Sequence, residues 1–129
     1  MNLKSKGINA ERDLIHKFWE TGKWSAIRVA GSGSMKYPSA DVIASNKLRT
    51  LAIECKVTKD NKKYFDEKEI DDLNYFARFF NAESWIGVKF KGLDWLFVNT
   101  RDLEKTEKMY LVDKEKTKKN GLLFEELIK

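Results

Sequence analysis

Two acids and a lysine stand at the ends of neighbouring apolar runs, where together they could support metal-dependent chemistry. Asp41 precedes the apolar residues 42–44, and Glu54 and Lys56 follow the apolar residues 51–53. If these runs pair as adjacent antiparallel strands, the three charged side chains come close together. Because strand side chains alternate between faces, Glu54 and Lys56 share one face of the sheet. The pattern therefore indicates a metal-dependent nuclease.

The chemistry of phosphodiester hydrolysis explains why these residue types would be grouped. The reaction requires an activated water, stabilisation of transition-state charge and a neutralised leaving oxygen, all of which metal ions can supply. Mg²⁺ binds oxygen ligands and keeps several waters, and Mn²⁺ can take its place. We expect Asp41, Glu54 and the backbone carbonyl of Cys55 to bind one Mg²⁺ ion, while Lys56 orients or deprotonates the attacking water. The thiol of Cys55 points away from both acids, so we expect it in the core and not as a nucleophile.

An acid two residues before a lysine is common in a chain with 35% charged residues. The same spacing begins at Asp60 and at Asp66, both in polar surroundings. Only Glu54 ends an apolar strand that follows another strand headed by an acid. An ion pair on an edge strand is the structural alternative to a catalytic role for Glu54 and Lys56.

Glu11 and the segment 31–34 are two further candidates. Glu11 lies beside Arg12 on a predicted helix and could reach a second metal ion, but the residues alone favour a solvated acid near a helix N-terminus. Segment 31–34, which ends at Ser34, either presents amides and hydroxyls to a phosphate, with Arg28 just upstream, or is a flexible connector. It lacks the spacing of a nucleotide-binding P-loop, so we expect no nucleotide cofactor.

The order of these parts resembles the archaeal-type Holliday junction resolvases, a branch of the PD-(D/E)XK nuclease superfamily that includes viral members. The resemblance spans roughly residues 6–99. It rests on the following residues: Lys6, Gly7, Asn9, Ala10, Glu11, Arg12, Arg28, residues 31–34, Pro38, Asp41, Ile53, Glu54, Cys55 and Lys56.

This resemblance implies a homodimer that uses Mg²⁺ to cut symmetrical strands of four-way or branched DNA. It assigns four residues to catalysis: Glu11, Asp41, Glu54 and Lys56. It places Ser32 in a catalytic loop. It assigns three basic residues to phosphate contacts: Lys6, Arg12 and Arg28. On this basis Glu11 joins Asp41 and Glu54 as an expected metal ligand.

Two positions depart from the family pattern. Ala40 precedes Asp41, where the superfamily name has proline, and Glu69 occupies a helix position where relatives often have Gln. Two other functions fit the same residues. One is a restriction-like or nicking nuclease of the same chemistry, and the other is a branched-DNA-binding module without catalytic activity.

Length and composition favour one domain over residues 1–129, with a core at about 6–99 and a tail at 100–129 of unassigned role. The hydrophobic fraction of 42% suits a chain with its own core. Its single Cys excludes an internal disulfide and fits a reducing compartment. No apolar run approaches the roughly 20 residues of a membrane span, so we expect a cytoplasmic protein without membrane partners, or one in the host cytoplasm if the source is a virus.

Charge is unevenly distributed along the chain. Residues 1–63 hold 13 Lys and Arg against 6 Asp and Glu, whereas residues 64–129 hold 12 against 14. The basic half includes the predicted acidic site. Its basic residues could therefore hold a phosphate backbone while the acids hold cations, and ordinary solvated lysines are the alternative interpretation.

Together the predicted elements and the resemblance give an α/β fold class: a restriction-endonuclease-like domain whose central, mixed, mostly antiparallel sheet is flanked by helices. We expect one helix from a cap at Asn9 to about Thr21, and two more over residues 70–80 and 122–128. We expect strands over residues 26–30, 42–44, 51–53, 85–90, 95–99 and 109–112. Residues 59–63 and 114–120 are predicted as polar loops.

Overall fold

The computed structural model describes residues 3–31 and 36–129, and its centre is a five-stranded sheet with the order β1-β2-β3-β5-β6. The strands of this sheet are β1 (Ser25–Arg28), β2 (Val42–Ser45), β3 (Thr50–Thr58), β5 (Glu83–Phe90) and β6 (Leu96–Asn99). A three-stranded sheet of order β4-β8-β7 is formed by β4 (Lys62–Asp66), β7 (Glu104–Lys105) and β8 (Met109–Asp113). The helices are α1 (Leu3–Glu20), α2 (Glu67–Phe79), the 3₁₀ turn η2 (Thr100–Asp102), α3 (Lys114–Asn120) and α4 (Phe124–Leu127).

Strand pairing confirms the predicted mixed, mostly antiparallel sheet. β1 pairs with β2, β2 with β3, and β5 with β6 in antiparallel fashion, whereas β3 and β5 are parallel. A parallel pair needs a long crossover between its strands, and β4 together with α2 supplies it. The α/β fold class is therefore confirmed.

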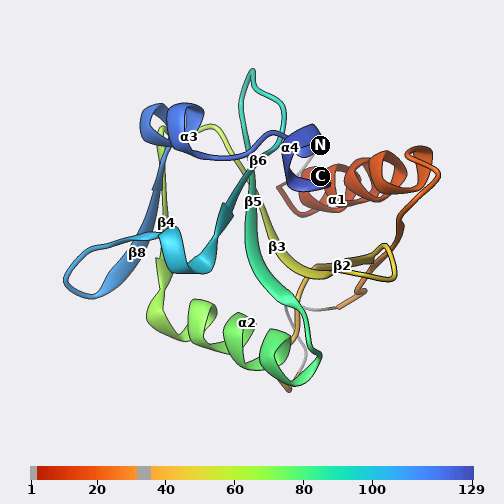
Figure 1. Cartoon of the computed structure of the whole chain (residues 1–129). Helices are drawn as coiled ribbons and strands as arrows, with labels where there is room; N and C mark the ends of the chain where they lie inside the picture. Colours follow the sequence, from red (N-terminus) through yellow and green to blue (C-terminus); the bar gives the residue numbers. More distant parts are fainter. Residues whose placement is uncertain (1–2, 32–35) are drawn as a thin grey trace.

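Helices cover both faces of the central sheet (Figure 1). One face packs against α1 and α4, and the other packs against α2 and the small sheet. On α1 the buried residues Ala10, Leu14 and Phe18 recur at every fourth position, which gives the helix one apolar stripe. α1 is followed by Gly22 at φ 72°, a left-handed conformation that glycine adopts without strain. The apolar stripe thus docks α1 on the sheet in a fixed register.

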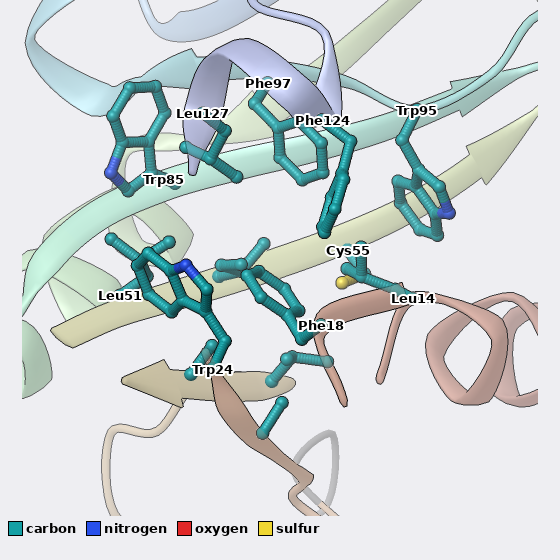
Figure 2. Packing of buried hydrophobic residues seen from close by; sticks show 14 of the residues in the cluster. Leu14, Phe18, Trp24, Leu51, Cys55, Trp85, Trp95, Phe97, Phe124 and Leu127 are labelled. Carbon is teal, nitrogen blue, oxygen red and sulfur yellow. The ribbon is translucent and has the colours of Figure 1, made fainter. Parts of the chain in front are cut away.

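The C-terminal tail completes the core on the α1 face. Figure 2 shows Phe124 of α4 beside Phe18 of α1 and Phe97 of β6. The ring centroids of Phe18 and Phe124 are 5.0 Å apart, and Leu127 is 1% exposed in the same cluster. Arg49 also donates from Nη1 to the carbonyls of Leu127 (2.7 Å) and Lys129 (3.1 Å). The tail, which had no assigned role in the sequence, therefore stabilises the layer that holds α1.

Several predicted boundaries are wrong. α1 begins at Leu3 and not at a cap at Asn9, which lies inside the helix. The predicted loop around residues 59–63 contains the start of β4, whose Phe65 is fully buried. The predicted loop at 114–120 is α3, which Asp113 caps by accepting from the N–H of Lys116 (3.1 Å). The remaining predicted elements are present with ends shifted by a few residues.

Among the helices of residues 3–31 and 36–129, none combines the length and apolar character required to cross a membrane.

Candidate active site

Asp41 is held just before β2 by the backbone of its neighbours. Its N–H donates to the carbonyl of Ile53 (3.1 Å), and its carbonyl accepts from the N–H of Val29 (2.8 Å). Its carboxylate Oδ2 accepts from the N–H of Cys55 (2.9 Å). Asp41 is only 9% exposed. The hairpin register thus fixes this buried carboxylate beside the middle of β3.

Glu54 lies next to Asp41 on β3, as the antiparallel pairing predicts. Burial, and then the negative charge of Asp41, raise the pKa of Glu54 from its usual 4.5 to about 8. A hydrogen bond with Asp41 further favours the protonated form. Cys55 faces the other way and is buried beside Leu14 in the core (Figure 2), as expected for a residue that is not a nucleophile. Glu54 therefore carries negative charge only at a cost in free energy.

Glu11 approaches the same carboxylates from α1. Arg28 donates from Nε to Glu11 Oε1 at 2.9 Å, and the two side chains are 20% and 15% exposed. Burial, and then the charge of Asp41, raise the pKa of Glu11, while Arg28 opposes the shift. The interpretation of Glu11 as a solvated acid near a helix N-terminus is wrong because α1 begins more than two turns earlier. The resemblance-based grouping of Glu11 with Asp41 matches the observed placement.

Lys56 lies between the carboxylates of Glu54 and Glu69. Its Nζ is 3.9 Å from Glu54 Oε2 and 3.7 Å from Glu69 Oε2. Glu69 stands in the first turn of α2, where its Oε1 accepts from the N–H of Asp66 (3.5 Å) and completes a capping box. One oxygen of Glu69 thus closes the helix start and the other faces Lys56. In the sequence Glu69 stands out only as a departure from the family pattern, although an acid three residues after Asp66 is the signature of the capping box.

Comparison with known proteins places these residues in a family. A sequence profile described as archaeal Holliday junction resolvase matches residues 2–129. The chain belongs to the archaeal Holliday junction resolvases. The match includes the tail, so it extends well beyond Asn99, where the resemblance was expected to end.

Individual relatives agree with this assignment. The crossover junction endodeoxyribonuclease Hjc of Archaeoglobus fulgidus is 41% identical over 111 residues, covering 86% of this chain and 81% of that protein. The protein of the same name from Methanocaldococcus jannaschii is 32% identical over 123 residues, covering 95% and 86% respectively. The solved structure of Archaeoglobus fulgidus Hjc superposes with a TM-score of 0.87 at 36% identity, covering 95% of this chain and all of that one (100%). The restriction-endonuclease-like fold expected of this resolvase family is confirmed.

The predicted phosphate-contact residues of this resolvase differ in their surroundings. Lys6 and Arg12 are exposed on α1. Arg28 contacts Glu11, so its guanidinium is already engaged by an acid of the site. Ser32 and Ser34 lie outside the described residues. The structure thus brings Arg28 to the carboxylates and leaves Lys6 and Arg12 open to solvent.

Donor chemistry in this resolvase suits a hard divalent cation. Glu11, Asp41 and Glu54 supply only oxygen atoms, and burial, followed by the negative charge of Asp41, raises the pKa of Glu11 and of Glu54. Nearby positive charge would relieve that repulsion. Within the described residues no group of three or more Asp, Glu, His or Cys side chains is already poised around a metal ion. The expected ligands Glu11, Asp41, Glu54 and the Cys55 carbonyl are therefore not already arranged around a cation, and Glu11 is held by Arg28.

Proposed function

We propose that this chain resolves four-way DNA junctions by metal-dependent phosphodiester hydrolysis. The observation behind this proposal is the meeting of Glu11, Asp41, Glu54 and Lys56 in a chain of the archaeal Holliday junction resolvase family. Its relatives from Archaeoglobus fulgidus and Methanocaldococcus jannaschii are named crossover junction endodeoxyribonucleases. The chain would act as a single domain in the cytoplasm.

Mg²⁺ is the proposed cofactor, with Mn²⁺ as a substitute. Asp41, Glu54 and the Cys55 carbonyl would hold it, and Glu11 would bind once its contact with Arg28 loosens. The bound ion supplies Lewis-acid stabilisation of phosphate charge and a lowered pKa for water. Asp41 contributes a carboxylate whose direction the amide of Cys55 fixes. Glu54 must release its proton to act as a ligand, because its pKa is raised to about 8 in the protein alone.

Lys56 is the proposed proton-transfer or water-orienting group. Its ammonium forms ion pairs with the carboxylates of both Glu54 and Glu69. It also lies 6.0 Å from the ring centroid of Phe65, which limits its movement toward the core. A lysine held in this way can hydrogen-bond a water at the scissile phosphate and balance the charge that develops there.

A homodimer is proposed because a symmetrical junction presents two equivalent strands. The exposed side of α2 and the residue after its end form an apolar surface, which includes Tyr75 (60% exposed), Phe79 (71%) and Phe80 (51%). The rings of Tyr75 and Phe79 pack in a tilted arrangement with centroids 5.0 Å apart, and those of Phe76 and Phe80 stack at 5.1 Å. Aromatic clusters of this kind on a surface mark interaction sites. A two-fold contact through α2 would supply two active sites for two cuts.

Cleavage assays test the catalytic part of this proposal. A labelled four-way junction and a linear duplex of the same sequence would be incubated with Mg²⁺ or with a chelator. We expect paired cuts of the junction with Mg²⁺, and no cutting of either DNA with chelator. Equal cutting of the duplex would instead favour a restriction-like or nicking nuclease. Tight junction binding without any cutting would favour a catalytically silent binding module.

Sedimentation of the free protein tests the dimer. The double substitution Tyr75→Lys and Phe79→Lys should convert a dimer into a monomer, because it places charge within the apolar contact. Leu48→Lys serves as a matched control, since Leu48 is also apolar and is 91% exposed away from α2. A wild-type monomer, or a dimer that survives the double substitution, would contradict the α2 contact.

A further inference from the structure

A second concave surface lies at the far end of α1 from the acidic site. It is an open groove of about 930 Å³ between the end of α1 and the turn of the β2–β3 hairpin. Figure 1 shows this hairpin turn on the same side of the molecule as the C-terminal end of α1. The residues that matter here are Trp19, Lys23, Ser25, Ser45, Asn46 and Lys47.

The groove has the chemistry of an anion-binding surface. Lys23 and Lys47 are both exposed and stand on its two sides, while no Asp or Glu is among the described residues that line it. The hydroxyls of Ser25 and Ser45 donate to the carbonyls of Ser45 (3.5 Å) and Arg49 (3.0 Å), so they line the groove as neutral polar groups without a proton to spare for a ligand. Trp19, 55% exposed, supplies an apolar wall. The lining thus offers the positive charge of two lysines with no carboxylate to repel a phosphate.

Hydrogen bonds within the protein hold both walls of the groove. The indole Nε1 of Trp19 donates to the carbonyl of Ala26 (2.9 Å), which fixes the ring on the edge strand β1. In the hairpin turn, Asn46 Oδ1 accepts from the N–H groups of Leu48 (3.0 Å) and Arg49 (2.7 Å). Lys47 adopts φ 84° in this turn, so its backbone is set in a left-handed conformation. A preformed surface loses little conformational entropy when it binds a ligand.

The groove and the acidic site lie at opposite ends of one seam between α1 and β1. The Arg28–Glu11 ion pair marks one end of the seam, and the hydrogen bond from Trp19 to Ala26 marks the other. Along α1, Glu11 and Trp19 are separated by about 12 Å at 1.5 Å per residue. Along β1, Arg28 and Ser25 are separated by about 10 Å at 3.3 Å per residue. Both elements therefore give a similar spacing between the two sites.

We propose that this groove binds the phosphate backbone of a duplex arm of the junction, about three base pairs from the cleaved bond. The inference rests on the proposed function and deepens it by naming a contact outside the catalytic centre. At about 3.4 Å per base pair, the spacing along the seam corresponds to about three steps of the duplex. A duplex arm is favoured as the occupant because, under the proposed function, the catalytic site would hold the same backbone at the other end of the seam.

Junction binding across a salt series tests the charge contacts. The double variant Lys23→Gln and Lys47→Gln would be compared with the parent protein, both carrying Glu54→Gln so that the DNA stays intact. Each lost phosphate contact should lower the slope of log K_obs against log salt by about 0.9, so the double variant should lose about 1.8. The control is Lys118→Gln with Lys119→Gln on α3, which removes the same charge elsewhere. A slope change equal to that of the α3 control would overturn the proposal.

Neutral phosphates test where the DNA lies. Methylphosphonate groups would be placed one at a time at two to five base pairs from the cleaved bond. For the parent protein we expect the largest loss of affinity at about three base pairs, and that maximum should vanish in the Lys23 and Lys47 double variant. A flat profile, or the same maximum in both proteins, would contradict an arm in this groove and leave an acidic protein segment as the better occupant.

These outcomes separate the groove from the catalytic proposal. If wild-type protein fails to cut the junction, the proposed function fails whatever the groove does. If wild-type protein cuts the junction but the salt slope and the methylphosphonate profile do not respond to Lys23 and Lys47, only the groove assignment is wrong.

Discussion

Two arginine–glutamate ion pairs at strand ends look alike in length but differ in their effect on the acid. Arg28 Nε lies 2.9 Å from Glu11, and Arg49 Nε lies 2.8 Å from Glu83. Yet the pKa of Glu11 is raised, whereas the hydrogen bond from Arg49 lowers the pKa of Glu83. The same two residue types thus leave one glutamate easier to protonate than usual and the other harder to protonate.

The contacts around Arg49 and Glu83 explain why the charged form of Glu83 is favoured. Arg49 binds Glu83 through two nitrogens, with Nη2 at 2.9 Å from Oε1, and Trp85 Nε1 donates to the same oxygen at 3.1 Å. Arg49 also donates to the last carbonyls of the tail and lies over the Trp24 ring at 5.8 Å. A planar guanidinium suits such a bidentate contact. This pair therefore joins the hairpin to the C-terminus.

The first pair leaves its acid under-compensated. Glu11 receives one hydrogen bond from Arg28 and also experiences the charge of Asp41 nearby. Its burial adds to the cost of the charged form. Arg49 therefore completes a contact that stabilises the fold, whereas Arg28 only partly compensates the negative charge of the clustered acids. The remaining negative charge is what a divalent cation would offset.

The largest expected effect is a loss of cleavage when an acid of the active site is replaced. Asp41→Asn should lower junction cleavage by about 10⁴-fold, because metal stabilisation of the transition state is worth several kcal/mol. Its free energy of unfolding should change little, because the side-chain oxygen of Asn can still accept from the N–H of Cys55. Chemical denaturation and single-turnover cleavage would measure the two quantities. Cutting at the wild-type rate under Mg²⁺ would exclude Asp41 as a metal ligand.

Lys56→Ala should lower the cleavage rate at saturating junction by about 10²- to 10⁴-fold, the usual contribution of a positioned proton-transfer group. Junction affinity should change little, because the role of Lys56 lies in the transition state. Binding and single-turnover assays on the same variant separate the two. If the loss of affinity accounts for the whole loss of activity, Lys56 is a plain phosphate contact.

The stability of the metal-free protein should depend on pH through Glu54. Its pKa is about 8 in the folded state against 4.5 ordinarily, so the folded protein holds a proton that the unfolded chain has released. Stability should therefore fall as pH rises from about 5 to about 8, by about 3 kcal/mol for this group. The difference between wild type and Glu54→Gln isolates the effect. Mg²⁺ should reduce the fall, and a pH-independent difference would refute the raised pKa.

Arg49→Lys should act on the fold alone. Losing the bidentate contact and the contacts to the tail should lower the free energy of unfolding by about 1 to 2 kcal/mol, a range that allows for solvent screening of the partly exposed pair. Cleavage per folded molecule should not change. Arg28→Lys is the matched substitution, and it should impair cleavage with a smaller effect on stability. An equal loss of stability in both variants would erase the contrast between the pairs.

The smallest effect is expected at Glu69. Glu69→Gln keeps an oxygen for the N–H of Asp66 but removes the charge facing Lys56, so cleavage should change by only a few-fold, about 1 kcal/mol or less. Glu69→Ala removes both contacts and should reduce the rate further without altering junction affinity. A large loss of cleavage in Glu69→Gln would show that the negative charge of Glu69 contributes to catalysis, beyond its hydrogen bond to the N–H of Asp66.

The sequence was sufficient to predict the grouping of Asp41, Glu54 and Lys56 because their geometry depends on one local hairpin and on strand alternation. The position of Glu11 was harder, since it depends on how α1 docks on the sheet. The start of α1 and the helical state of residues 114–120 were missed for the same reason: neither segment shows a regular apolar repeat. In α3, only Thr117 is buried.

Contacts between residues far apart in the chain could largely not be predicted from the sequence. The ion pair between Lys56 and Glu69 joins β3 to the helix of the crossover, and no periodicity in the sequence specifies that meeting. The contact of Arg49 with the carbonyl of Leu127 spans 78 residues. Contacts of such sequence separation follow from the whole packing of the molecule and leave no local signature.

Closure of the core by the tail makes the acidic site sensitive to breaks in the chain far from it. Phe124 and Leu127 belong to the same cluster as Leu14 and Phe18, which seat the helix that carries Glu11. A proteolytic cut between α3 and α4 would take these two side chains out of the core and weaken the packing of α1 on the sheet. Glu11 would then lose its support beside Asp41, so damage to the tail would appear as a loss of nuclease activity.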